Sequence, residues 1–233
     1  MNHASDYTGR ALQTALMEQP SLSLDFYSYG VLLRKRDGET MTEYPVDPAQ
    51  IAAALAARVI FDTGLLGADT LLVRYEGVKQ LVIGYRKAQK TGLYLEGSET
   101  PLRVPLPGLI LIRVTKEHRR PAYHLYAVKR RPQHLDVALF HAPLPNIYTS
   151  GSICWGTVRT VSETALTGAS LAEDWQQLLG SPFGDHSVQG KSNAYRQDIR
   201  QQLIALEKRK ARRYPTSDLL PMQKTLSQLL GAE

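Results

Sequence analysis

Cysteine is almost absent from this chain, since Cys154 is the only one in 233 residues. One cysteine excludes an internal disulfide and a zinc site built from several cysteines. We therefore expect a reduced, cytoplasmic protein. By number alone, Cys154 is either a small buried apolar residue or a reactive thiol, and the residues around it must distinguish the two.

Long apolar runs are lacking too, and none approaches the roughly 20 residues that a membrane-spanning helix needs. Residues 1–7 contain no basic stretch followed by an apolar one, so we expect no secretory signal and no membrane partner. The six histidines show no metal-ligand spacing, and Gly64 and Gly67 lack the Lys and Ser/Thr of a phosphate-binding loop. We expect neither a metal nor a small-molecule cofactor.

The rest of the composition is that of an ordinary globular protein, with 43% hydrophobic and 21% charged residues. The length allows one large domain or two small ones, and either can bury a core. The net charge of +6 and the pI of about 9.4 suit an anionic partner, either a nucleic acid or an acidic protein surface. The same charge also fits a basic face that is simply solvated.

The first part of the chain predicts strands at residues 22–26, 29–34 and 40–44, with a hairpin turn at Asp37-Gly38. A helix over residues 49–62 follows, because Asp47 and Pro48 suit its first positions. Strand-like segments come next, joined by connections short enough for an antiparallel meander. They are residues 70–75, 79–87, 91–96, 103–107 (an edge strand or a loop, given its prolines), 109–115, 123–130 and 135–141.

The last part of the chain predicts helices. Ser170 is a good N-cap for a helix that runs to about residue 179, and a longer helix is expected over residues 193–213. A short helix near residues 226–230 completes the chain. The second of these helices ends in a cluster of cations that either complements its dipole or contacts nucleic acid: Lys208, Arg209, Lys210, Arg212 and Arg213.

Cys154 ends a loop that begins at Pro143. Two prolines, an asparagine, three Ser/Thr hydroxyls and a glycine precede the thiol, which is typical of a shaped loop and not of a helix. The loop follows the predicted strand 135–141. A lone thiol at the end of a loop carried by a strand is a plausible nucleophile.

The sequence of this loop resembles the active-site segment of ubiquitin-conjugating (UBC-fold) enzymes. In that family a His-Pro-Asn triplet precedes a Gly-x-Ile-Cys element, with the asparagine eight residues before the cysteine. The matching residues here are Pro145, Asn146, Ile147, Gly151, Ile153 and Cys154. The departure is Leu144, which stands where the family usually has histidine.

The resemblance implies an α+β, UBC-like fold, made of an N-terminal helix, an antiparallel β-meander, an active-site loop and C-terminal helices. Residues 47–233 would form this domain. Residues 1–46, with their extra strands, would be an N-terminal extension. The similarity is most specific around Cys154, and it covers roughly residues 47–213.

The resemblance also implies roles for site residues. Cys154 would carry a ubiquitin-like protein as a thioester, and Asn146 would stabilise the oxyanion or hold the loop. Asp185, or one of its neighbours Ser181, His186 and Ser187, would orient and deprotonate the incoming lysine. Two alternatives stay open, because Asn146 could simply cap its own turn and Asp185 could be a solvated turn residue.

Leu144 cannot make the hydrogen bonds of the family histidine, so the loop needs another brace. His141 is one candidate, although a histidine beside a strand is more often structural. Trp155, directly after the thiol, either covers it, meets a partner or belongs to the core. A hydrolase built from Cys154 and a histidine is a further alternative, but no spacing in the sequence defines it.

Among UBC-like families, the chain is similar to the B proteins of PRTRC cassettes, which plasmids and mobile elements carry. The likeness rests on the long N-terminal strands, the Leu-Pro-Asn-Ile-Tyr wording at residues 144–148 and the length. It implies two partners, a ThiF-like activating enzyme and a small ubiquitin-like protein. Two other functions stay open: a UBC-like binding module without catalysis, and a basic nucleic-acid-binding protein.

Overall fold

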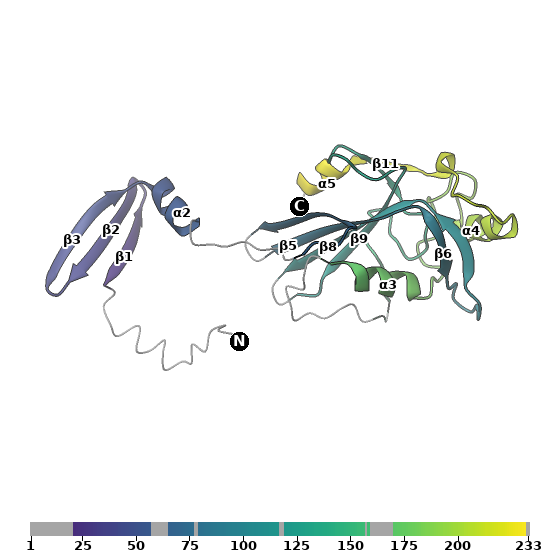
Figure 1. Ribbon diagram of the computed structural model, residues 1–233, viewed down its shortest axis with the longest axis horizontal. Coiled ribbons are helices and arrows are strands. Elements are labelled where there is room, and N and C mark those ends of the chain that lie inside the picture. Colours follow the sequence, from purple (N-terminus) through teal and green to yellow (C-terminus); the bar gives the residue numbers. More distant parts are fainter. Residues whose placement is uncertain are drawn as a thin grey trace. The chain divides into compact units, whose positions relative to one another are not determined.

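The computed structural model describes residues 21–56, 65–76, 79–116, 119–156, 158 and 170–231. Contacts divide the chain into two units, residues 1–62 and residues 63–233, each of which is described by itself. Figure 1 labels the elements of both. The last part of the predicted helix over residues 49–62 lies outside the described residues, as does the start of the chain.

The first unit contains a three-stranded antiparallel sheet in the order β1-β2-β3, with β1 at Leu22–Tyr27, β2 at Gly30–Asp37 and β3 at Thr40–Val46. The predicted strands and the turn after Asp37 are confirmed, and Gly38 takes the positive φ (+63°) that this turn requires. Helix α2 (Pro48–Ala56) begins as predicted, because the carboxylate of Asp47 accepts a hydrogen bond from the Ala49 N–H at 2.8 Å.

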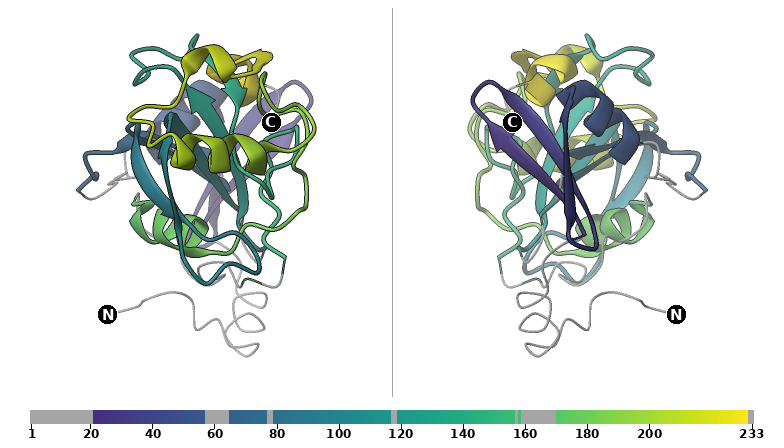
Figure 2. Two further views of the ribbon diagram at one scale, coloured as in Figure 1. Left: turned by 90° about the vertical axis from the view of Figure 1, so that its right-hand side faces the viewer. Right: turned by 90° about the vertical axis from the view of Figure 1, so that its left-hand side faces the viewer.

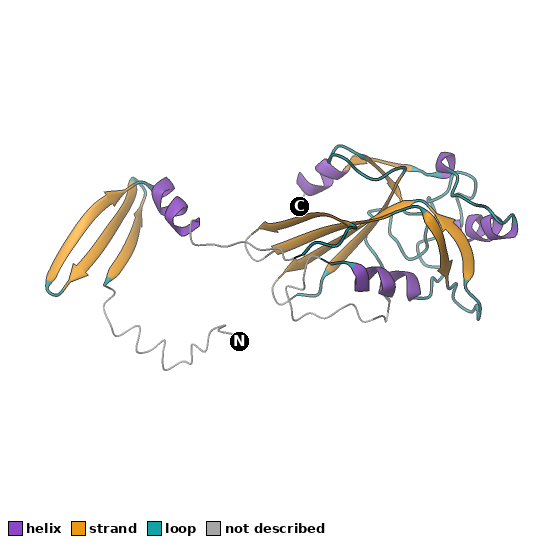
Figure 3. Cartoon of the chain, in the orientation of Figure 1, coloured by secondary structure: helices purple, strands orange, loops and turns teal. Residues whose placement is uncertain are grey.

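The second unit is built on a six-stranded antiparallel sheet in the order β11-β10-β9-β8-β5-β4. Figure 3 draws the strands of both units in orange. The strands are β4 (Thr70–Glu76), β5 (Lys79–Arg86), β8 (Gly108–Lys116), β9 (Ala122–Val128), β10 (Ala138–His141) and β11 (Pro221–Thr225). The predicted meander is therefore present from β4 to β10. β11, which pairs with β10 at the edge, was not expected from the sequence.

The meander is interrupted by a hairpin. β6 (Gln89–Leu93) and β7 (Leu102–Leu106) pair with each other in a separate two-stranded sheet between β5 and β8. Pro105 lies within β7 and cannot donate a backbone hydrogen bond, which is tolerated because β7 has a strand on only one side. The segment over residues 103–107 is thus an edge strand.

Helices cover both faces of the large sheet. One face, together with the β6–β7 hairpin, forms an apolar cluster with α3 (Ala172–Gly180) and α4 (Ile199–Lys208), which contribute Trp175 and Leu203. The other face packs against Leu226 and Leu230 of α5 (Leu226–Gly231). Figure 2 shows α4 in front of the sheet in its left view. No helix among the described residues is long and apolar enough to cross a membrane.

Helix α4 is shorter than the predicted helix over residues 193–213. It begins at residue 199, because the Asp198 side chain accepts the Arg200 N–H at 2.9 Å and so caps the first turn. It ends at residue 208, and Lys210 takes a left-handed φ of 50°. Most of the expected basic helix end therefore lies beyond the helix.

A buried carboxylate explains why the segment before α4 is not helical. Asp218 accepts hydrogen bonds from the Ser192 hydroxyl, the Ala194 N–H, the Gln202 amide and the Tyr214 hydroxyl. These bonds wrap the chain around Asp218 before α4 starts. Helix α3 also starts slightly later than predicted, with Ser170 accepting the Ala172 N–H at 3.3 Å.

Candidate active site

The loop before Cys154 is closed like a hairpin. The Cys154 N–H donates to the Asn146 carbonyl at 2.8 Å, and the Tyr148 N–H donates to the Ser152 carbonyl at 2.8 Å. Between these bonds, Ile147 and Ile153 form an antiparallel bridge. The eight-residue spacing therefore places Asn146 directly opposite Cys154.

Strand β9 holds one arm of this loop. The Leu125 N–H donates to the Gly151 carbonyl at 2.8 Å, and the Ile153 N–H donates to the Tyr123 carbonyl at 3.1 Å. Gly151 has a φ of +91°, and a Cβ atom there would overlap the ring of Tyr126. Glycine is required at this position for both reasons.

The segment over residues 182–191 braces the other arm. The Asn146 N–H donates to the His186 carbonyl at 2.8 Å, and the Ser187 hydroxyl donates to the Ile147 carbonyl at 2.7 Å. The Lys191 ammonium donates to the Leu144 carbonyl at 2.7 Å. The loop is thus held through its backbone, which does not need a polar side chain at position 144.

Leu144 and Lys191 are both buried, with 0% and 1% of their surfaces exposed. Leu144 belongs to the core cluster on the α3 and α4 face of the sheet. Desolvation by burial lowers the pKa of Lys191 to about 7. Burial, with the charge of Lys191 as a second cause, also lowers the pKa of His141. Lys191 therefore braces the loop at Leu144. His141 does not take this role; besides burial, only the charge of Lys191 affects its pKa.

Asn146 has a left-handed φ of 59°, which asparagine tolerates better than most residues. Its Nδ2 donates to the Pro182 carbonyl at 3.3 Å, so one N–H of the amide is engaged and a second remains. Its Oδ1 is buried and has no hydrogen-bond partner among the described residues. Asn146 therefore ties its turn to the segment at Pro182 and keeps one amide N–H without a partner among the described residues.

Two aromatic side chains accompany the thiol. The interaction of the Tyr148 hydroxyl with the Cys154 side chain raises the pKa of Tyr148. The same hydroxyl lies 3.1 Å from Nε2 of His186, and the two rings meet edge to face with centroids 5.3 Å apart. Tyr148 and His186 are exposed, and Cys154 is half-buried. A nucleophile, a hydroxyl and an imidazole are therefore connected in one chain of contacts.

In the sequence, His186 stands out only as a neighbour of Asp185, and Tyr148 does not stand out as a site residue. A usable signal exists in the spacing. If Asn146 and Cys154 face each other across a hairpin, then Tyr148, two residues further on, shares their face of the ribbon. His186 has no such signal, because it comes from a distant segment.

Asp185 is exposed and precedes His186 in the chain. Its charge contributes to a raised pKa of Arg200, for which the hydrogen bond that Arg200 donates to the Asp198 carboxylate is the largest cause. Trp155 packs edge to face on Tyr123, with ring centroids 5.1 Å apart, and adjoins the core. Beneath it the Tyr123 hydroxyl and Arg113 bind the buried Asp174 at 2.7 and 2.8 Å.

Comparison with protein-family models gives a match over residues 49–222 to the family described as prokaryotic E2 family D. The chain belongs to prokaryotic E2 family D. At the level of this family it is a ubiquitin-conjugating-like protein, and the expected likeness to UBC-type proteins is confirmed to that extent. Neither the curated proteins nor the solved structures contain a match to the chain.

The family match begins inside α2, whereas the contacts separate the chain after residue 62. The expected boundary between residues 46 and 47 stays a prediction. Membership of family D suggests a ubiquitin-like protein and an activating enzyme as partners in general. No group of three His, Cys, Asp or Glu side chains in the described ranges is placed to hold a metal ion.

Proposed function

We propose that this protein carries a ubiquitin-like protein as a thioester on Cys154 and transfers it to an amine. The observation that carries the proposal is the contact of Cys154 with Tyr148, and of Tyr148 with His186, on a loop closed by the Asn146 carbonyl. A thiol suits this task because its thiolate attacks carbonyls well and its thioester stays reactive toward amines.

In the loading step, the Cys154 sulfur would attack the activated C-terminal carbonyl of the ubiquitin-like protein. A bond forms between sulfur and the carbonyl carbon, and the bond to the activating group breaks. The thiol proton has two possible acceptors. It passes through the Tyr148 hydroxyl to His186, or it passes to the leaving group. The remaining N–H of Asn146 is available to the oxyanion, and one such donor contributes about 3–4 kcal/mol in well-studied hydrolases.

In the transfer step, the amine nitrogen attacks the thioester carbonyl, and the carbon–sulfur bond breaks to release the Cys154 thiolate. The amine must lose a proton. The Tyr148 hydroxyl, 3.1 Å from Nε2 of His186, can take that proton as it gives its own to the imidazole. Asp185 remains a candidate for orienting the incoming amine beside His186.

The finer assignment is part of the same proposal. We infer a protein like the PRTRC B proteins, cytoplasmic, whose partners are a ThiF-like activating enzyme and a small ubiquitin-like protein of the same cassette. The loop wording at residues 144–148 and the strands β1 to β3 ahead of the family match support this inference.

The test is to incubate the chain with the activating enzyme, the ubiquitin-like protein and ATP. We expect an adduct that dithiothreitol removes, that needs ATP and that Cys154→Ala abolishes. Cys154→Ser should lose the reducible adduct as well. If the ubiquitin-like protein binds but no reducible adduct forms, the proposal is wrong and a binding module without catalysis takes its place.

A further inference from the structure

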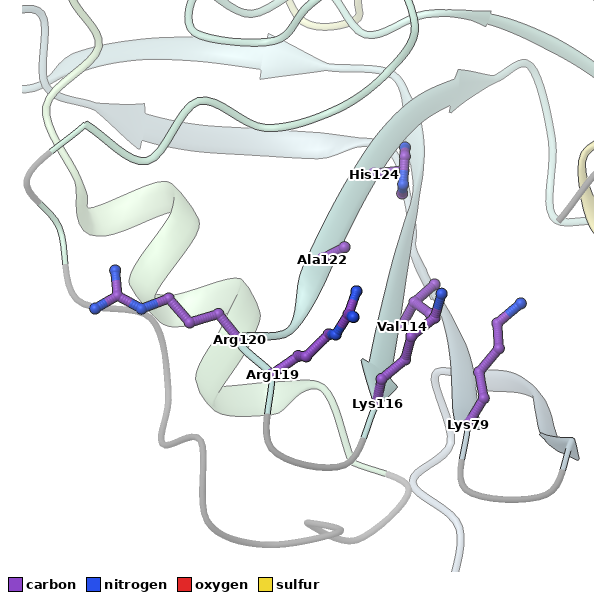
Figure 4. Close-up of a pocket in the computed structure, with 7 residues that line it drawn as sticks. All are labelled: Lys79, Val114, Lys116, Arg119, Arg120, Ala122 and His124. Atoms are coloured by element: carbon purple, nitrogen blue, oxygen red, sulfur yellow. The ribbon is translucent and has the colours of Figure 1, made fainter.

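A basic pocket of about 370 Å³ lies at one end of the large sheet, where β8 turns into β9. Figure 4 shows its lining. The residues come from the start of β5, from the end of β8, from the connection and from the start of β9: Lys79, Val114, Lys116, Arg119, Arg120, Ala122 and His124.

The side-chain nitrogens of Lys79, Lys116 and Arg119 point to the same side, whereas Arg120 points away from them (Figure 4). Glu76 lies 3.5 Å from the Lys79 ammonium and offsets part of its charge. The lining residues that the structure describes include no carboxylate. Lys116 and Arg119, both exposed, therefore supply most of the net positive charge.

The strand periodicity accounts for this pocket. Alternate residues share one face of a sheet, so Ile112, Val114 and Lys116 of β8 line the same face. The apolar part of that face is covered by Leu226 and Leu230 of α5. Where β8 ends and β5 begins, this face carries Lys116 and Lys79. Charged side chains stay in solvent, so no helix has to cover the sheet there.

The basic pocket borders the active-site loop. His124, which lines it, forms a bridge with Ser152, and its Nδ1 lies 3.4 Å from the Ser152 hydroxyl. Ser152 precedes Cys154 by two residues. A partner seated on the pocket would consequently lie beside the loop that carries the thiol.

We propose that the basic pocket docks an acidic patch on the ubiquitin-like protein that Cys154 carries. This inference rests on the proposed function. The carried protein is the partner that stays beside the loop in loading and in transfer alike. A cluster of cations next to the thiol would hold carboxylates on its surface, speed its encounter and fix its orientation.

The test measures binding of the ubiquitin-like protein to the full chain with Cys154→Ser, without activating enzyme or ATP. We expect Lys116→Glu combined with Arg119→Glu to weaken binding about tenfold or more at about 50 mM NaCl, and less at about 300 mM because salt screens exposed charges. The matched control is Lys87→Glu with Lys90→Glu. This pair makes the same charge change beyond the other end of β5, at exposed positions, and should bind like the unmodified protein.

Equal affinity of the two double variants overturns the docking site, and an adduct that still forms on Cys154 then leaves the proposed function intact. Conversely, the Lys116/Arg119 variant could lose binding while the unmodified chain forms no adduct. That result supports the docking site and contradicts the proposed thioester on Cys154. A short DNA duplex is tested in the same way. The inference is also overturned if DNA binding requires Lys116 and Arg119 while the ubiquitin-like protein binds both double variants equally. Thermal unfolding of each variant checks that the fold is kept.

Discussion

The ammonium of Lys191 donates a hydrogen bond to the carbonyl of Leu144 at 2.7 Å, and both residues are buried. This contact fixes the chain two residues before Asn146. Position 144 of the loop therefore contributes an apolar side chain to the core and a backbone acceptor to the brace.

The brace makes stability depend on pH. Lys191 has a pKa of about 7 in the folded chain against an ordinary value of 10.5, so between these values the unfolded chain holds a proton that the folded chain lacks. Stability then rises with pH. From about pH 7.5 to about 9.5, we expect the unfolding free energy of the natural chain to gain about 2 kcal/mol over that of Lys191→Met. Urea denaturation measures both, and parallel curves would contradict the assignment.

Restoring the usual family residue should harm this protein. Leu144→His places an imidazole in the core cluster, close to Lys191. We expect a loss of about 2–4 kcal/mol in unfolding free energy, because a buried polar ring replaces a packed apolar side chain. Leu144→Met, which keeps volume and polarity, should cost less than about 1.5 kcal/mol. Equal stability of the two variants would count against the backbone brace.

Asn146 can be divided into its two roles. Asn146→Gly keeps the left-handed backbone and removes the amide, whereas Asn146→Ala also adds strain of about 1–2 kcal/mol. If the amide meets the oxyanion, both variants should load Cys154 about 100-fold more slowly. If Asn146 only shapes the turn, the glycine variant should keep most of its rate. Single-turnover loading assays distinguish the two outcomes.

Tyr148 and His186 should act on transfer. Tyr148→Phe removes the hydroxyl between Cys154 and Nε2 of His186, and we expect transfer from the loaded thioester to a free amine to slow about 100-fold. His186→Gln keeps a hydrogen-bonding partner but cannot accept the proton, so it should slow transfer to a similar extent.

The matched control for these two variants is Tyr29→Phe. Tyr29 is 82% exposed and lies in the other unit, so the same loss of a hydroxyl there should leave transfer unchanged. Transfer at the natural rate in Tyr148→Phe would show that the phenol only packs against the imidazole.

The sequence alone indicated much of this architecture. The alternation of residues 22–44, the turn at Gly38 and the meander from β4 to β10 follow from local patterns, and the structure has them. The fixed spacing of Asn146 and Cys154 also has a physical meaning, since the bond from the Cys154 N–H to the Asn146 carbonyl closes the loop from within. Short-range hydrogen bonds and side-chain periodicity carry all of these features.

Tertiary structure alone decided the rest. His186 reaches Tyr148 across 38 positions and Lys191 reaches Leu144 across 47, and no periodicity links such pairs. The late start of α4 has the same cause, because the buried Asp218 takes the donors of the preceding segment. The residue pattern around Cys154 predicted a reactive cysteine. Only the folded chain brings Tyr148, His186 and Lys191 together around its loop.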